Sequence, residues 1–197
     1  MVVPTRAEAA AVLLGFRRPP WFLAHVSAVA EVAAFLARRI EDRGLVIDRP
    51  LVEAAALLHD IDKLFAADDP LRSLGHGDAG ARWLTEHGMP ELAPAVAGHP
   101  ITRLSDPRRY ERWAAFSNRE VRVVAYADKR AAQRLMPLDG RIEDMARRHP
   151  EHRDALAFAR PRAQRLEREI CAAAGIRPEE VRRQRWVSRA LREAAKR

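Results

Sequence analysis

Apolar side chains recur every three or four residues along most of the chain, the spacing that places them on one face of an α-helix. The longest such stripe covers about residues 21–43. Its inward positions are Phe22, His25, Val26, Val29, Val32, Ala33 and Leu36. A shorter helix precedes it, because Thr5 and Glu8 form a capping box in front of the apolar run at 9–14. The chain is therefore expected to open with two helices.

The same spacing predicts further helices in the middle of the chain, at about 50–60, 79–87, 90–99 and 119–135. Proline and glycine residues mark most of their boundaries. Residues 101–118 are rich in arginine and aromatic side chains. We expect them to form a polar connection, and connections of this length are usually functional or mobile.

Two more helices are expected in the C-terminal third, at about 152–174 and 178–197, separated by Gly175. The sequence contains no internal repeat, no low-complexity tract and no clear strand. These patterns predict a single all-α domain over residues 1–197. Its helical core would cover about 20–135, and additional helices would follow from about 140 to the end.

Composition agrees with a helical protein that has a substantial core. Of the 197 residues, 48% are hydrophobic and only 6% are aromatic, which favours packed helices over sheets. The single cysteine, Cys171, excludes an internal disulfide and suits a reducing compartment. The longest N-terminal apolar run, 9–16, is shorter than the roughly 20 residues that a membrane span needs. We therefore expect a cytoplasmic protein that does not enter a membrane.

The formal net charge of +8 is compatible with nucleic-acid binding. Nearly all of the basic charge is arginine, however, since the only lysines are Lys63, Lys129 and Lys196. Such a skew often follows the base composition of a genome rather than selection for a partner. We expect a basic surface that attracts phosphorylated small molecules, with nucleic acid as the less favoured partner.

Arginines are also concentrated in the last predicted helix, at Arg182, Arg183, Arg185, Arg189 and Arg192. The apolar stripe of the same helix consists of Val181, Val187, Leu191 and Ala194. This pattern is typical of a helix that docks on the core and exposes a solvated arginine face. The alternative is a surface that binds nucleic acid or a protein partner.

A pair of potential metal ligands, His59 and Asp60, closes an apolar helical stretch that should be buried. Burying an imidazole and a carboxylate costs several kcal/mol unless a partner compensates, and a bound metal is the simplest compensation. His25 lies on the inward stripe of an earlier helix, and Asp128 lies on a later one. A lone histidine on an apolar face is more often a core residue, but a bundle can bring ligands from separate helices to one point.

On these residues the chain resembles the HD superfamily of metal-dependent phosphohydrolases, whose signature is a His, then a His-Asp pair, then a distant Asp. The matching positions are His25, His59, Asp60 and Asp128, and the resemblance covers about residues 20–135. The run His-Asp-Ile-Asp-Lys is similar to the common His-Asp-Ile-Gly-Lys, with Asp62 in place of glycine. This extra carboxylate could neutralise Lys63, tune a bound water or lower the affinity for polyanionic substrates.

His76 and His99 resemble the two extra histidines of the bimetal subgroup of that superfamily. The six-ligand pattern is most similar to the HD-type symmetrical dinucleoside tetraphosphate hydrolases, although Pro100 stands where those enzymes usually carry threonine. By this resemblance, His76 and His99 would hold a second ion that Asp60 bridges to the first. The alternative is that they bind the substrate's phosphate beside a single metal.

The resemblance implies an all-α HD bundle and a hydrolase that cleaves a phosphoester or phosphoanhydride bond with metal-activated water. The substrate would be a small, nucleotide-like phosphorylated compound. One or two divalent ions would bind, and imidazole with carboxylate suits Mn, Fe, Co, Ni, Zn or Mg without selecting among them. The protein would be a monomer or a homodimer. Alternatives are a non-catalytic nucleic-acid or partner-binding protein, and a di-iron oxygenase that uses the same ligands.

Basic residues near these motifs are candidates for phosphate binding. Lys63 lies one turn after His59, and in the family the equivalent lysine lies near the substrate phosphate, so Lys63 and Asp60 are the expected catalytic residues. A salt bridge from Lys63 to Asp62 or Glu53 is the alternative. Three further candidates, which a solvated surface would explain equally well, are Arg103, Lys129 and Arg134. The other histidines, His87, His149 and His152, are expected to be solvated.

Overall fold

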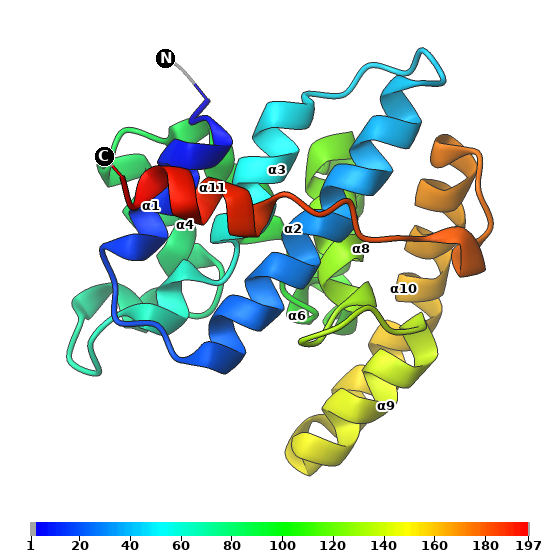
Figure 1. The fold of residues 1–197 in the computed structure, drawn as a ribbon. Coiled ribbons are helices and arrows are strands. Elements are labelled where there is room, and N and C mark those ends of the chain that lie inside the picture. Colours follow the sequence, from blue (N-terminus) through cyan, green and yellow to red (C-terminus); the bar gives the residue numbers. More distant parts are fainter. Residues whose placement is uncertain (1–2, 197) are drawn as a thin grey trace.

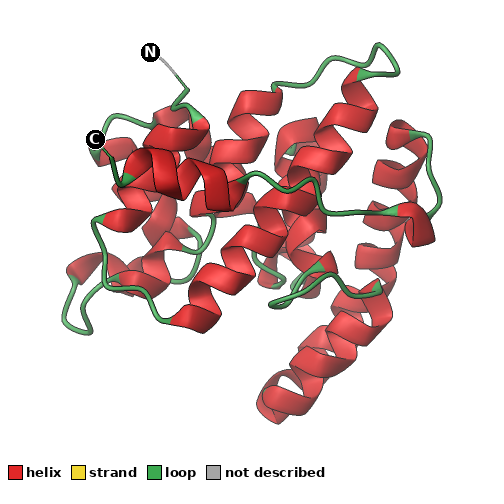
Figure 2. Cartoon of the chain, in the orientation of Figure 1, coloured by secondary structure: helices red, strands yellow, loops and turns green. Residues whose placement is uncertain are grey.

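The computed structural model describes residues 3–196, and every regular element in that range is helical (Figure 2). The α-helices are α1 (Arg6–Leu14), α2 (Pro20–Glu41), α3 (Arg49–Leu58), α4 (Asp78–Glu86), α5 (Ala93–Gly98), α6 (Thr102–Ser105), α7 (Pro107–Phe116), α8 (Arg119–Arg130), α9 (Leu138–Arg148), α10 (Arg153–Ala174) and α11 (Val187–Ala194). Short 3-10 turns are η1 (Ile61–Leu64), η2 (Pro70–Leu74), η3 (Pro90–Leu92), η4 (Pro150–His152) and η5 (Pro178–Glu180). The expected all-α fold is confirmed.

Helix α2 is the centre of the core, with α3 and α8 packed against it (Figure 1). Pro20 starts it at a position where the missing N–H costs nothing. Its apolar residues are buried on several sides, as Phe22, Leu36 and Ile40 are fully inaccessible to solvent. In the described residues it is the one helix long and apolar enough to cross a membrane, but 67% of that apolar window is buried within the fold. Core packing therefore accounts for its composition.

The two ends of the described chain meet. Helix α11 packs on α1, and the extended segment before α11 crosses α2 (Figure 1). The carboxylate of Glu31 on α2 is buried and accepts from the Arg183 guanidinium at 2.9 Å, while its backbone carbonyl accepts from the Gln184 N–H at 2.9 Å. These bonds hold the C-terminal segment against the core.

The expectation of a polar connection over 101–118 was wrong, because this segment forms α6 and α7. Asp106 caps α7 by accepting from the Arg109 N–H at 2.7 Å, and Pro107 occupies the first turn. A carboxylate cap followed by proline is a helix-start signal that the arginine-rich composition obscured. The helix buries no residue completely, so its apolar stripe is weak.

Three other boundaries differ from the expectation. Helix α8 ends at Arg130 rather than near 135, because Ala131 is extended and pairs with Leu135 in an isolated bridge. Helix α9 was not predicted. The last helix begins at Val187 rather than Pro178, since η5 and an extended segment occupy the residues between. Helices α9, α10 and α6 share a second, smaller cluster that includes Leu104, Ile142 and Leu156.

Candidate metal centre

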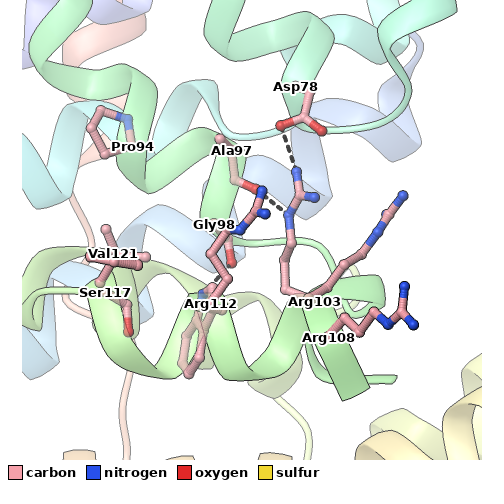
Figure 3. Close-up of a pocket in the computed structure, with 12 residues that line it drawn as sticks. Asp78, Pro94, Ala97, Gly98, Arg103, Arg108, Arg112, Ser117 and Val121 are labelled. Atoms are coloured by element: carbon pink, nitrogen blue, oxygen red, sulfur yellow. Dashed lines mark hydrogen bonds and ion pairs between the residues drawn. The ribbon is translucent and has the colours of Figure 1, made fainter. Parts of the chain in front are cut away.

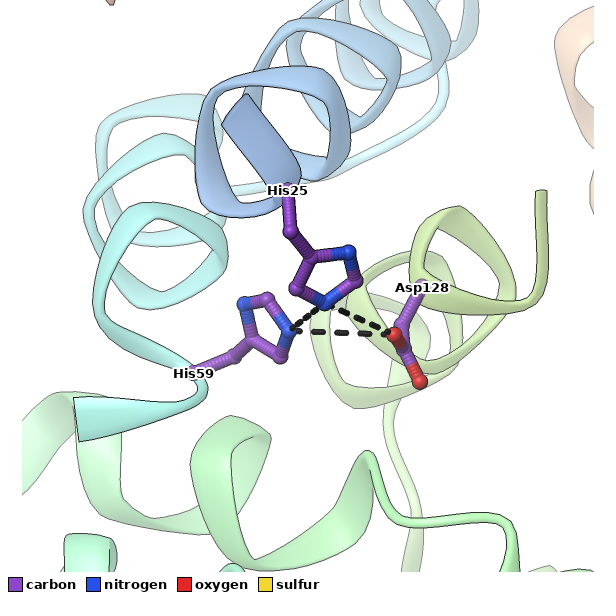
Figure 4. Close-up of side chains that lie close together, drawn as sticks. All are labelled: His25, His59 and Asp128. Atoms are coloured by element: carbon purple, nitrogen blue, oxygen red, sulfur yellow. Dashed lines mark hydrogen bonds and ion pairs between the residues drawn. The ribbon is translucent and has the colours of Figure 1, made fainter. Parts of the chain in front are cut away.

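Six side chains from five segments of the chain converge at one face of α2. His25 lies on α2, His59 and Asp60 directly follow α3, and Asp128 lies on α8 (Figure 4). His76 precedes α4 and His99 follows α5. Figure 4 shows His25, His59 and Asp128 pointing toward one another. The structure thus brings together every metal ligand that the sequence predicted.

Most of these ligands are hidden from solvent. His25, His59, Asp60 and His99 are buried, whereas the His76 side chain is 39% exposed. Fully buried ionisable groups are costly unless they are paired or bind a metal. The centre is therefore shielded from solvent except at His76, where solvent and ligands can enter.

The Asp60 carboxylate divides the cluster into two halves. Its Oδ2 lies 3.2 Å from His25 Nε2 and 3.5 Å from His59 Nε2. Its Oδ1 lies 3.3 Å from His76 Nε2 and 3.5 Å from His99 Nε2. Asp128 belongs to the first half, because its Oδ1 lies 3.5 Å from His25 Nε2. One carboxylate thus faces a separate pair of imidazoles with each oxygen.

The other ring nitrogen of each histidine is hydrogen-bonded away from the centre. Nδ1 of His25 lies 2.9 Å from the Ala132 carbonyl oxygen. The corresponding bonds of His59 and His99 reach carbonyls three residues earlier, at 2.8 Å and 2.6 Å. Because a carbonyl only accepts, each of these Nδ1 atoms carries a proton, and Nε2 is the nitrogen that can offer a lone pair to an ion in the centre. This is the arrangement that outer hydrogen bonds impose on metal-binding histidines.

The spacing of the inward atoms fits coordination of an ion. The Nε2 atoms of His25 and His59 are 3.1 Å apart, and so are those of His76 and His99. Two ligand atoms about 2.1 Å from one ion, at angles of about 90–110°, are about 3.0–3.4 Å apart. Two inward lone pairs at this distance repel each other unless a metal ion or a proton lies between them. The donor set and its geometry therefore suit a divalent metal.

Without a metal, the two histidines of the first half have opposite proton affinities. Burial alone would lower the pKa of His25, but hydrogen bonds and charges from Asp128 and Asp60 outweigh it and raise that pKa to about 9. Burial lowers the pKa of His59 to about 3 despite the nearby Asp60. Near neutral pH, and without a metal, His25 is therefore the protonated, positively charged imidazole of the pair, and His59 is neutral.

Both carboxylates of the centre are ionised. Burial opposes their charge, but His59 and Lys63 hold the pKa of Asp60 well below its usual range. Lys129 and His25 do the same for Asp128. Two ionised carboxylates together with inward imidazole lone pairs make the centre attractive to a dication.

Of the predicted phosphate-binding residues, Lys63 lies at the centre. Its ammonium donates to Asp60 Oδ2 at 2.7 Å, and its side chain is 42% exposed. The alternative pairing with Asp62 or Glu53 does not occur; Glu53 pairs with Arg6 at 2.6 Å instead.

Lys129 is buried beneath the ligands. Its ammonium donates to Asp128 Oδ2 at 2.7 Å and to the carbonyl oxygen of His99. These bonds fix one carboxylate ligand and the backbone that carries one imidazole ligand. Lys129 therefore supports the centre from within.

Arg103 and Arg134 make no contact with the six ligands in the described residues. Arg103 pairs with Asp78 at 2.6 Å and donates to the Ala97 carbonyl at 2.8 Å. Arg134 is exposed, on the turn that follows α8. Of the remaining histidines, His87, His149 and His152 are exposed, as expected.

Two pockets flank the centre, and Lys63 lines both. One, of about 250 Å³, also includes His25, Trp21, Arg141 and Arg148 in its lining. The other, of about 170 Å³, includes His76 and Arg72. Sequence reasoning missed the arginines and Trp21 as site residues. Arg141 and Arg148 lie on the unpredicted α9, so no sequence signal marked them.

Comparison with known proteins gives one result. Residues 22–133, more than half of the chain, match the family model described as HD domain. This range begins on α2 and ends just beyond α8, and it contains all six ligands. No curated protein and no solved structure matches the chain.

Proposed function

This chain belongs to the HD domain family, and we propose that it uses one or two divalent ions to hydrolyse a phosphoester or phosphoanhydride bond. The substrate is a small, nucleotide-like phosphorylated compound. The observation that carries this proposal is the convergence of six ligands with Asp60 shared between them. Metal-dependent hydrolysis is typical of the family.

The geometry favours two ions over one. His25, His59 and Asp128 offer atoms to one ion together with Asp60 Oδ2. His76 and His99 face the opposite oxygen of Asp60 and offer a second set. Binding of substrate phosphate by His76 and His99 beside a single ion is the alternative. Asp60, with imidazoles facing each of its oxygens, would help to hold both ions of a two-metal hydrolytic centre.

When bound, a divalent ion would lower the pKa of water and offset the negative charge of the phosphate. The chain's own groups would bind and orient the substrate. Lys63 stands at the junction of both pockets with a partly exposed ammonium, so it can hold a phosphate oxygen next to Asp60. Arg72 in one pocket and Arg141 in the other would bind the anionic groups farther from the scissile bond.

The two pockets support a substrate that extends on both sides of the bond to be cleaved. A dinucleoside polyphosphate has that shape, and the six-ligand pattern also favours it. Trp21 in the larger pocket is 49% exposed and offers a ring against which a base could stack. We therefore place symmetrical dinucleoside tetraphosphates first among the candidate substrates.

The test combines metal analysis with a substrate screen. The protein is stripped of metal, reloaded with Mn, Fe, Co, Ni, Zn or Mg, and assayed for phosphate or nucleotide release from mononucleotides and diadenosine tetraphosphate. His59→Ala or Asp60→Ala should abolish both metal binding and turnover, whereas His152→Ala, an exposed histidine, should change neither. An active, metal-free His59→Ala protein would refute the proposal, as would iron-dependent oxygen consumption without hydrolysis.

A further inference from the structure

One well-defined cavity lies away from the metal ligands. It has a volume of about 570 Å³ and is walled by α5, α7 and the start of α8 (Figure 3). A cavity of this size is within the range that small-molecule sites occupy. None of its lining residues also lines either of the pockets beside Lys63. It is therefore a separate concavity rather than an arm of the metal cleft.

Its lining is strongly basic. Four arginines line it, at Arg103, Arg108, Arg109 and Arg112, against a single acidic residue, Asp78. In Figure 3 the Arg112 side chain extends toward Ala97 and Gly98, as that of Arg103 does, whereas Arg108 points away from them. Among these four arginines, only Arg103 has hydrogen-bond partners for its guanidinium in the described residues, namely the Asp78 carboxylate and the Ala97 carbonyl.

The other three arginines are exposed and form no ion pair or hydrogen bond through their side chains within residues 3–196. Single exposed arginines are ordinary, and a helix surface can carry several. Three guanidinium groups without an acidic partner around one cavity are different, because their donors are all available to a single ligand. A polyanion can accept charge-assisted, bidentate hydrogen bonds from them.

Aromatic side chains form the other part of the wall. Phe116, at the end of α7, is 83% exposed although it is large and apolar. Trp113 is held in place, because its Nε1 donates to the Gly98 carbonyl at 2.9 Å. The Arg122 guanidinium lies 5.5 Å from the centre of the Trp113 ring. Phe116 is thus the ring free to stack against a planar group next to the arginines.

We propose that this cavity is a second ligand site, distinct from the metal centre, for a phosphorylated molecule with a planar ring, such as a nucleoside diphosphate. The phosphates bind Arg108, Arg109 and Arg112. The ring lies against Phe116. This assignment does not depend on hydrolysis at the metal centre.

The position of the cavity connects it to the second half of the centre. Arg103 joins Asp78, two residues after His76, to Ala97, two residues before His99. Gly98 is packed so closely that a Cβ there would lie 2.4 Å from Val121 and 3.4 Å from the Trp113 ring. A ligand in the cavity therefore contacts the backbone that positions two of the imidazole ligands.

The test is calorimetric titration of the full-length, metal-loaded protein with adenosine methylenediphosphonate, which resists hydrolysis. We expect two bound molecules per chain, one of them removed by EDTA and the other retained. The double variant Arg108→Ala/Arg112→Ala should weaken the EDTA-resistant site at least tenfold and leave the other site unchanged. Phe116→Ala should weaken binding of the nucleotide at the EDTA-resistant site but should not change binding of methylenediphosphonate, which has no ring.

The matched control is Arg168→Ala/Arg185→Ala, which removes two exposed arginines that line neither this cavity nor the pockets beside Lys63. It should leave both sites intact. The proposal is wrong if both double variants weaken binding equally, or if neither does. It is also wrong if the cavity variant abolishes binding of a single-stranded RNA oligomer while the nucleotide does not bind. If the unmodified protein binds a single molecule that EDTA does not remove, and the cavity variant weakens it, the metal-centre proposal is contradicted and this one stands.

Discussion

Metal binding to the centre should release about one proton per ion in the half formed by His25 and His59. The two Nε2 atoms are 3.1 Å apart, and without an ion between them the pKa of His25 is raised to about 9 while that of His59 is lowered to about 3. Below about pH 8 His25 is therefore protonated, and an ion must displace that proton. Below about pH 9, each decrease of one pH unit should lower the affinity for the metal about tenfold, or by about 1.4 kcal/mol in binding free energy.

Between pH 8.5 and pH 6.5 the expected loss is thus about a hundredfold, or about 2.7 kcal/mol. The assay is calorimetric titration of Mn²⁺ into metal-free protein at several pH values. Each pH is measured in two buffers of different ionisation enthalpy, because the difference in heat counts the protons released. His87→Ala removes an exposed histidine and should leave the proton count unchanged. An affinity that does not change over this pH range, with no proton released, would refute the reasoning.

Three further outcomes are expected. Asp62→Ala should lower the affinity for the second ion about 10–100-fold, because it removes the acceptor for His76 Nδ1. Asp62→Asn keeps an oxygen at this position and should lower that affinity less. Metal titration measures both affinities. Gly77→Ala should lower the metal content by one ion, as measured by elemental analysis. Gly77 has φ +84°, and a Cβ there would lie 2.6 Å from Pro100 Cγ. The backbone must therefore shift, and the shift displaces the neighbouring His76. Leu36→Ala, in the fully buried centre of α2, should lower the free energy of unfolding in urea by about 2–5 kcal/mol without changing metal content; a loss below about 1 kcal/mol would contradict the packing.

The helices that the sequence predicted well are those that bury a broad apolar face. The stripe over 21–43 corresponds to α2, and its boundaries differ by one or two residues. The helices that were missed, α7 and α9, bury few or no apolar side chains and carry many arginines. Their stability depends on caps and on neighbours that are distant in sequence, so periodicity alone did not reveal them.

The cluster of candidate metal ligands could be predicted because their residue types and their order along the chain carry the signal. The residues around them were not, since their positions depend on tertiary packing. Lys129 illustrates the difference: it follows Asp128 and was a candidate for phosphate binding, yet it is buried and donates to Asp128 and to the His99 backbone. Arg141 reaches the cleft only because α9 folds back beside the end of α8, where its Nε donates to the Ala131 carbonyl at 2.9 Å.

The carboxylate of Asp62 compensates for the place of His76 in the fold. His59 and His99 stand at the C-terminal ends of helices, so a carbonyl three residues back is within reach of each Nδ1. His76 precedes a helix, and its Nδ1 pairs with a carboxylate instead of a backbone carbonyl. Asp62 Oδ2 accepts from its Nδ1 at 2.9 Å and from the Gly77 N–H at 3.1 Å, which orients the ring and fixes the loop together. A glycine at that position could do neither, so the extra negative charge beside the candidate metal centre is explained by the need to hold His76, and Lys63 stays free to pair with Asp60.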